Sequence, residues 1–154
     1  MYRVRRQVRV PYPAARMYDL VNDVESYPRF LPWCSRAEVL QRDGGQIVAA
    51  LTLSLARMRL ALTTRNTLVP GRGIRMQLVS GPFRCLEGAW RFDDADAPGS
   101  CRVSLELDFA LRGRLLQLSL GPLLQRSAAS MADAFVARAH ELYRCSRDSS
   151  AAPP

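Results

Sequence analysis

The chain has 154 residues and a formal net charge of +8, and 48% of its residues are hydrophobic. That length fits one domain, and that hydrophobic content is sufficient for a core and too high for a disordered chain. All 22 basic residues are arginine, so lysine Schiff-base chemistry and a P-loop lysine are excluded. The longest uncharged stretch, residues 44–56, has thirteen residues, fewer than the roughly twenty that a membrane-spanning helix needs. Because the first ten residues lack the apolar run of a signal peptide, we expect a cytoplasmic protein.

Cysteine and histidine usage argues against a metal site and against a disulfide framework. The four cysteines are widely spaced without a C-x-x-C pair, and His140 is the single histidine. We therefore expect reduced cysteines that serve in packing, no metal and no covalently bound cofactor. The helical spacing places His140 on the exposed face of the last helix, where it has no serine or cysteine partner for a hydrolytic triad.

The first third of the chain predicts a strand followed by two short helices. Apolar and polar residues alternate over residues 2–10, as in a half-buried strand. Residues 13–22 have helical spacing, and a further turn can begin at Asp23 and end before Pro28. Residues 27–34, YPRFLPWC, are too rich in proline to be regular helix throughout.

The middle of the chain, from about residue 35 to residue 112, alternates with period two. Turn sequences rich in glycine, proline and aspartate interrupt the alternation at residues 43–45, 70–73, 81–82 and 96–99. This pattern predicts about six successive strands in an antiparallel meander.

Residues 121–145 return to helical spacing, and Gly121-Pro122 marks the predicted start. About 25 residues would form a helix of roughly 37 Å. Its apolar stripe consists of Leu124, Ala128, Met131, Phe135, Ala139 and Leu142.

Together these elements predict an α+β helix-grip fold. A curved, seven-stranded antiparallel sheet would wrap around the long C-terminal helix, with two short helices after the first strand. We expect a single domain over residues 1–145 and a disordered tail over residues 146–154.

The sequence also resembles a known family. Residues 10–34, VPYPAARMYDLVNDVESYPRFLPWC, are similar to the coenzyme Q-binding START-like family, a polyketide cyclase-like branch of the SRPBCC superfamily. In bacteria this family is also called the RatA ribosome association toxin. The resemblance continues through residues 63–66, 81–92 and 131–143, so it spans about residues 8–143. Leu62 departs from it, because members often carry phenylalanine there.

The resemblance implies a protein that is not an enzyme and has one of two roles. Mitochondrial relatives are regarded as binding ubiquinone in support of respiration, whereas the bacterial toxin is described as binding the large ribosomal subunit and blocking subunit association. The motifs do not separate these alternatives, and we rank the quinone carrier first. Polyketide cyclases share the fold, but no acid–base pair is placed for such catalysis.

A quinone would need an apolar pocket between the sheet and the last helix. Tyr27 and Trp33 each carry a polar group for a quinone carbonyl. Simple core packing is the alternative for Met131 and Phe135, and a tight hairpin is the alternative for Phe83. The predicted pocket residues are Tyr27, Phe30, Leu31, Trp33, Phe83, Leu86, Trp90, Phe92, Met131 and Phe135.

The basic residues suggest a second surface. Residues 57–91 hold seven arginines and a single acid, Glu87. Alternation predicts one strand face for Arg57, Arg59 and Arg65, and Arg75 belongs to the same basic region. Such a surface would suit binding to the ribosome or peripheral binding to an anionic inner membrane. We expect no DNA partner. The alternative is a face that only makes the protein more soluble.

Overall fold

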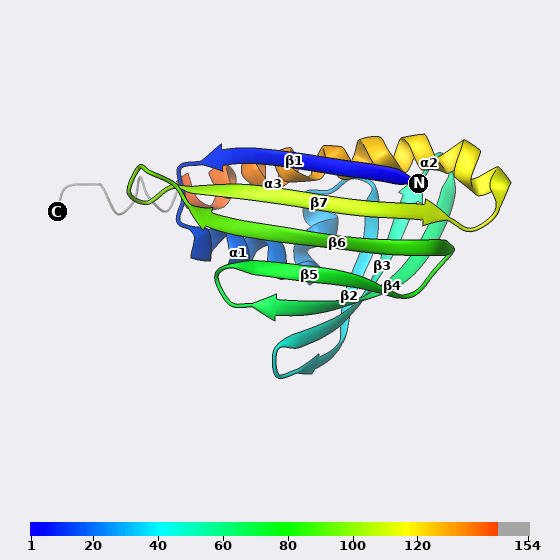
Figure 1. Ribbon diagram of the computed structural model, residues 1–154, viewed down its shortest axis with the longest axis horizontal. Coiled ribbons are helices and arrows are strands. Elements are labelled where there is room, and N and C mark those ends of the chain that lie inside the picture. Colours follow the sequence, from blue (N-terminus) through cyan, green and yellow to red (C-terminus); the bar gives the residue numbers. More distant parts are fainter. Residues whose placement is uncertain (145–154) are drawn as a thin grey trace.

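The computed structural model describes residues 1–144, which form seven strands and a series of helices (Figure 1). The strands are β1 (Tyr2–Val10), β2 (Cys34–Asp43), β3 (Gln46–Leu55), β4 (Met58–Val69), β5 (Gly73–Ser80), β6 (Phe83–Asp94) and β7 (Cys101–Leu111). The helices are α1 (Ala14–Asn22), the 3-10 helix η1 (Val24–Arg29), α2 (Arg114–Ala129), α3 (Met131–Ala139) and the π-helical turn η2 (His140–Arg144). The predicted tail and Cys145 lie outside the described residues.

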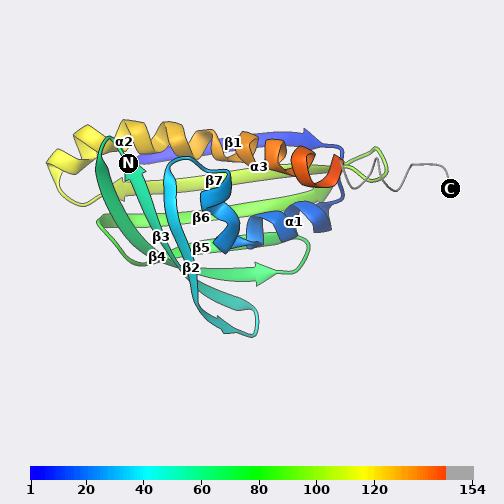
Figure 2. The ribbon, with the colours of Figure 1, turned by 180° about the vertical axis from the view of Figure 1, so that it is seen from behind.

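The strands form one antiparallel sheet in the order β1-β7-β6-β5-β4-β3-β2. The successive strands β2 to β7 pair with their neighbours in the chain, and β1 closes the other edge against β7. This confirms the predicted seven-stranded meander. All the helices lie on one side of the sheet, with α1 and η1 beside α3 (Figure 2).

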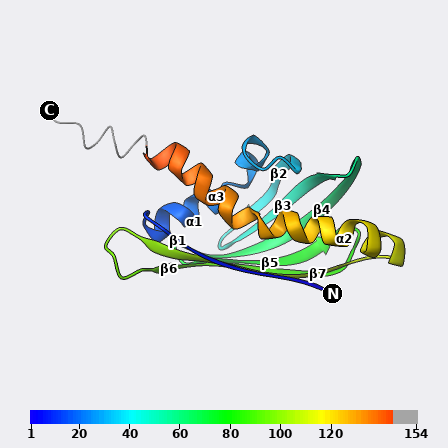
Figure 3. The same cartoon turned by 90° about the horizontal axis from the view of Figure 1, so that it is seen from above.

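The sheet curves around α2 and α3, so its inner side chains and the helices share one core (Figure 3). The alternation in β7 is regular, since every second residue from Cys101 to Leu111, Leu107 included, is buried and the residues between them are more exposed. This confirms the helix-grip fold. In residues 1–144 no helix combines the length and the hydropathy needed to cross a membrane.

The last helix begins earlier than predicted. Gly113, with φ of 90°, ends the turn after β7, and α2 starts at Arg114 rather than at Gly121. A Cβ at Gly121 would lie 2.3 Å from the Tyr2 ring, so this glycine permits close contact between β1 and α2 instead of starting a helix. The helix is also interrupted at Ser130, between α2 and α3.

The end of the last helix also differs from the prediction. The π-helical turn η2 carries Leu142 away from the apolar stripe, and Leu142 is 41% exposed. His140 is not a fully exposed residue, because its Nδ1 hydrogen-bonds with the hydroxyl of the buried Tyr12 at 2.8 Å. His140 therefore helps to hold the end of the helix against the segment after β1.

Two local predictions were wrong. Arg57 does not lie on a strand face, because Ala56 and Arg57 both have positive φ and form the two-residue turn between β3 and β4. Such a turn matches the twist of the paired strands. Pro28 does not end the turn that begins after Asp23, because η1 continues through Pro28 to Arg29.

Candidate ligand cavity and arginine surface

An apolar cavity of about 90 Å³ lies between the inner face of the sheet and the last helix. Five of the ten predicted pocket residues line it, namely Tyr27, Trp33, Phe83, Leu86 and Met131. Further lining comes from Val24, Ala49, Leu51, Leu53, Leu62, Met76, Leu105, Leu107, Phe109, Leu124 and Ala128.

The other five predicted pocket residues pack beside the cavity rather than around it. Phe135 is at the centre of this cluster, with ring centroids 5.1 Å from Phe30 and 5.3 Å from Trp90. Trp90 stacks on Phe92 at 6.3 Å, and Leu31 is fully buried nearby in the core. These side chains form the core beneath α3.

The polar group of Tyr27 is already engaged. Its hydroxyl donates a hydrogen bond to the backbone carbonyl of Val21. Burial raises the pKa of Tyr27, so the phenol stays protonated at neutral pH. In this structure the Tyr27 hydroxyl ties η1 to α1 and is not free to meet a ligand.

Two polar residues in the cavity wall were missed by the sequence analysis. Thr64 and Asn66 on β4 are buried, and the Thr64 hydroxyl donates to Oδ1 of Asn66 at 3.0 Å. This bond occupies the amide oxygen and leaves the amide N–H groups of Asn66 as donors at an otherwise apolar wall. The alternation of β4 carried the signal, because it places both residues on the same face as Leu60 and Leu62.

The four predicted surface arginines are exposed on β4, β5 and the turn before β4. Arg59 and Arg65 alternate with the buried residues of β4, so they face away from the helices. Arg75 pairs with Thr67 and is therefore a diagonal neighbour of Arg65. Within residues 1–144, none of Arg57, Arg59, Arg65 and Arg75 forms an ion pair. We call these four residues the arginine face.

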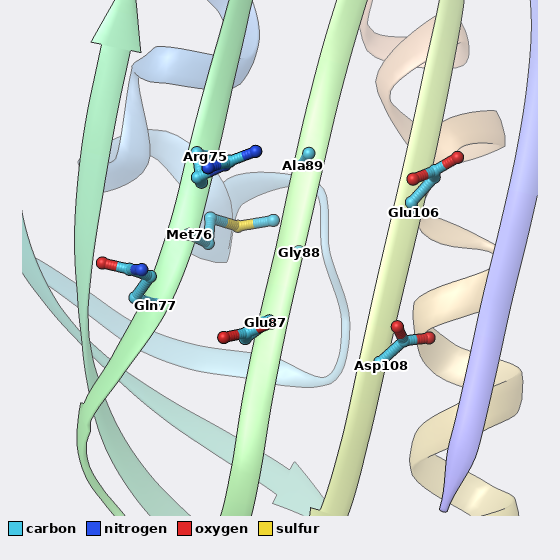
Figure 4. A pocket seen from close by; sticks show the side chains of 8 residues that line it. All are labelled: Arg75, Met76, Gln77, Glu87, Gly88, Ala89, Glu106 and Asp108. Atoms are coloured by element: carbon cyan, nitrogen blue, oxygen red, sulfur yellow. The ribbon is translucent and has the colours of Figure 1, made fainter.

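Beside the arginine face, the outer surface of the sheet has a shallow depression of about 250 Å³ (Figure 4). Gly88 and Ala89 of β6 are among its lining residues, and Ala89 has a small side chain. Around it lie Arg75 and three carboxylates, those of Glu87, Glu106 and Asp108. Asp108 pairs with Arg5 at 2.9 Å, so the β6–β7 part of the outer surface is mixed in charge and poorly suited to phosphate.

Arg138 on α3 forms a salt bridge with Glu141. Its Nη1 lies 3.0 Å from Glu141, and its guanidinium lies 5.5 Å from the centre of the Phe30 ring. The salt bridge stays within the last helix, and the contact with Phe30 joins α3 to the residue that follows η1. Arg138 does not line the cavity.

Cys34, Cys85 and Cys101 are free thiols. Burial raises the pKa of Cys34 to about 11, and burial with Asp94 and Asp93 nearby raises that of Cys101 to about 11. Both thiols should therefore resist alkylation near neutral pH.

These raised pKa values predict a loss of stability at high pH. The thiols of the unfolded chain ionise near their ordinary pKa of 9.0, before those of the folded chain. Their contribution to stability is complete below pH 9 and falls as the pH rises toward 11. Urea unfolding at pH 7.5, 9 and 10.5 measures this decline, which we expect to be smaller in Cys34→Ala/Cys101→Ala than in Cys85→Ala. An equal decline in both variants would show that Cys34 and Cys101 do not cause the loss of stability at high pH.

Comparison with known proteins agrees with this architecture. The sequence matches the family described as "Polyketide cyclase / dehydrase and lipid transport" over residues 10–136. In solved structures, the Zhui aromatase/cyclase from Streptomyces sp. R1128 is similar with a TM-score of 0.80 and 21% identity, over 90% of this chain and 93% of that chain. A START superfamily protein from Mycobacterium smegmatis is similar with a TM-score of 0.75 and 20% identity, over 92% of this chain and 99% of that chain.

Among curated proteins, "Ribosome association toxin RatA" of Pseudomonas aeruginosa is 44% identical over 140 residues, which cover 91% of this chain and 96% of that protein. "Coenzyme Q-binding protein COQ10 homolog B, mitochondrial" of Xenopus laevis is 27% identical over 83% of this chain and 54% of its own length. The fold, the cavity between sheet and helix, and these matches agree: the chain belongs to the polyketide cyclase / dehydrase and lipid transport family, and its relatives include RatA proteins.

Proposed function

We propose that this chain associates with the ribosome in the manner named for its RatA relatives, acts in the cytoplasm and catalyses no reaction. The observation that carries the proposal is the arginine face, whose four guanidinium groups are exposed and have no carboxylate partner within residues 1–144. Arginine forks bind phosphate oxygens bidentately, and phosphates dominate the surface of ribosomal RNA. The 44% identity to a RatA protein over nearly its whole length supports this choice over the quinone carrier.

The chemistry of the cavity supports a role without catalysis. Its lining contains no carboxylate, histidine or cysteine. General acid–base catalysis needs a positioned group that gains and loses a proton. The one titratable group in the lining is Tyr27, whose hydroxyl is bound to a backbone carbonyl.

Co-sedimentation with isolated ribosomal subunits tests the proposal. We expect the protein to sediment with the large subunit and not with the small one, and to lower the yield of joined ribosomes when the subunits are mixed. Failure to bind either subunit at low salt would contradict the proposal.

A second candidate is binding of an apolar ligand such as ubiquinone. The observation that favours it is the Thr64–Asn66 pair, which supplies amide donors for a carbonyl in an apolar cavity. The cavity volume of about 90 Å³ is below the roughly 300–1,000 Å³ typical of ligand pockets. A quinone would therefore enter only if the last helix moved away from the sheet.

Substitutions at this pair test the second candidate. This second candidate predicts that organic extraction of the protein from its host, followed by mass spectrometry, yields ubiquinone, and that Thr64→Val/Asn66→Leu abolishes it. Thr64→Val alone should destabilise the fold by about 1–3 kcal/mol, because it leaves a buried amide oxygen without a donor, while the double variant should be closer to the parent. Thr63→Val, on the outer face of the same strand, is the control. An empty extract from the parent protein would count against a quinone.

A further inference from the structure

The end of the molecule at which α2 begins combines exposed apolar side chains with unpaired arginines. Because neighbouring strands are antiparallel, this end gathers the starts of β1, β2, β4 and β6 and the ends of β3, β5 and β7. The segments that supply most of it, residues 52–65, 78–86 and 109–132, contain no aspartate or glutamate. The first turns of α2 extend beyond the end of β7 (Figure 3).

The exposed apolar residues of the described chain are concentrated here. Leu115 is 82% exposed and Leu118 is 69% exposed, and both lie on one side of α2 because they are three residues apart. Pro122, also exposed, continues the same stripe. Of the eight large hydrophobic residues that are exposed, five belong to this end, namely Met1, Met58, Val79, Leu115 and Leu118.

Three arginines border the same helix start. Arg84, Arg112 and Arg114 line a concavity of about 770 Å³ together with Gly113 and Gln117, and its lining contains no acidic residue. None of the three arginines forms an ion pair within the described part of the chain. The start of α2 has no side-chain cap and no acid in its first turn, so the partial positive charge of the helix end adds to that of the arginines. We call Leu115, Leu118, Arg84, Arg112 and Arg114 the leucine tip.

We infer that the leucine tip docks on an anionic lipid bilayer. Phosphate groups at the bilayer surface neutralise Arg84, Arg112 and Arg114, and Leu115 and Leu118 enter the boundary between headgroups and acyl chains. A nucleic acid would satisfy the arginines but would leave two protruding leucines against a polar surface, so the combination favours lipid. This contact uses none of the four residues of the arginine face and does not depend on ribosome association.

Flotation with lipid vesicles tests the inference. The full chain should float with vesicles of phosphatidylglycerol and phosphatidylcholine in equal parts, and not with vesicles of phosphatidylcholine alone. Leu115→Ser/Leu118→Ser should lower partitioning at least about tenfold, because burial of one leucine is worth about that factor. Arg84→Gln/Arg112→Gln/Arg114→Gln should also lower it and should remove most of its dependence on salt.

The control is Leu40→Ser/Val69→Ser, which replaces two residues that are 54% and 55% exposed away from the leucine tip. It should bind vesicles like the parent. The inference is overturned if the control and the leucine variant lose binding equally, or if neutral vesicles bind as well as anionic ones. A third result would also overturn the inference: the leucine variant binds vesicles normally, and the variant of Arg84, Arg112 and Arg114 no longer binds ribosomal subunits. The partner of this surface would then be RNA. The leucine variant should still bind ribosomal subunits like the parent protein. This measurement separates a failure of the lipid inference from a failure of the proposed function.

Discussion

Replacing the four residues of the arginine face by glutamine is expected to remove most of the salt dependence of binding to the large ribosomal subunit. Each phosphate contact contributes about 0.7–0.9 to the slope of log K against log salt, so four contacts contribute about three. Raising the salt concentration fourfold, from 50 to 200 mM, should then lower the binding constant of the parent protein about 60-fold more than that of the variant. The measurement is co-sedimentation of both proteins across that salt range. The variant is Arg57→Gln/Arg59→Gln/Arg65→Gln/Arg75→Gln.

A control with the same loss of charge separates a specific surface from general basicity. The control substitutes four other exposed arginines that form no ion pair within residues 1–144, and its slope should fall by much less. Equal loss in both variants would show diffuse attraction and would contradict the arginine face as the binding surface. The control variant is Arg9→Gln/Arg29→Gln/Arg42→Gln/Arg126→Gln.

The sheet could be predicted because each strand has one buried face. Alternation in β7 and β4 identifies which side chains face the helix, and turn residues separate most strands. The turn at Ala56-Arg57 escaped prediction because both residues have positive φ without the glycine or asparagine that usually permits it. Without that signal, alternation alone places Arg57 on the strand.

The start of the last helix depended on a contact between distant parts of the chain. Gly121-Pro122 resembles a helix start because proline is common in a first turn. In the structure Gly121 is required by the ring of Tyr2, which also stacks on Phe109 and donates to the carbonyl of Gln117. Sequence periodicity does not report a contact across 119 positions.

The cavity could be predicted only in part. Period-two spacing predicts that Leu86, Trp90 and Phe92 point inward, and all three are buried. It does not predict which of them border the cavity, because that depends on where α3 fills the interior. Phe135 occupies the space next to Trp90, so Leu86 lines the cavity and Trp90 does not. Thr64 and Asn66 could have been identified from the sequence, because polar residues on a buried strand face need hydrogen-bond partners.

The packing of Phe135 leads to the largest stability effect that we expect. Phe135 is 0% exposed, and its ring contacts those of Tyr27, Phe30 and Trp90. Phe135→Ala removes a large buried side chain and leaves a cavity, at a cost of about 3–5 kcal/mol in the free energy of unfolding. For a chain of this length that corresponds to roughly 6–20 °C in Tm.

Leu142→Ala is the matched control, because helical periodicity assigns Leu142 and Phe135 to one apolar stripe. Leu142 is 41% exposed, so its truncation should change the free energy of unfolding by no more than about 0.5 kcal/mol. Urea unfolding of both variants measures the difference. Similar losses in the two variants would mean that the last turn packs as regular helix against the sheet. A small loss in Phe135→Ala would instead mean that the aromatic cluster is loosely packed, and the space beneath α3 would then become part of the ligand cavity.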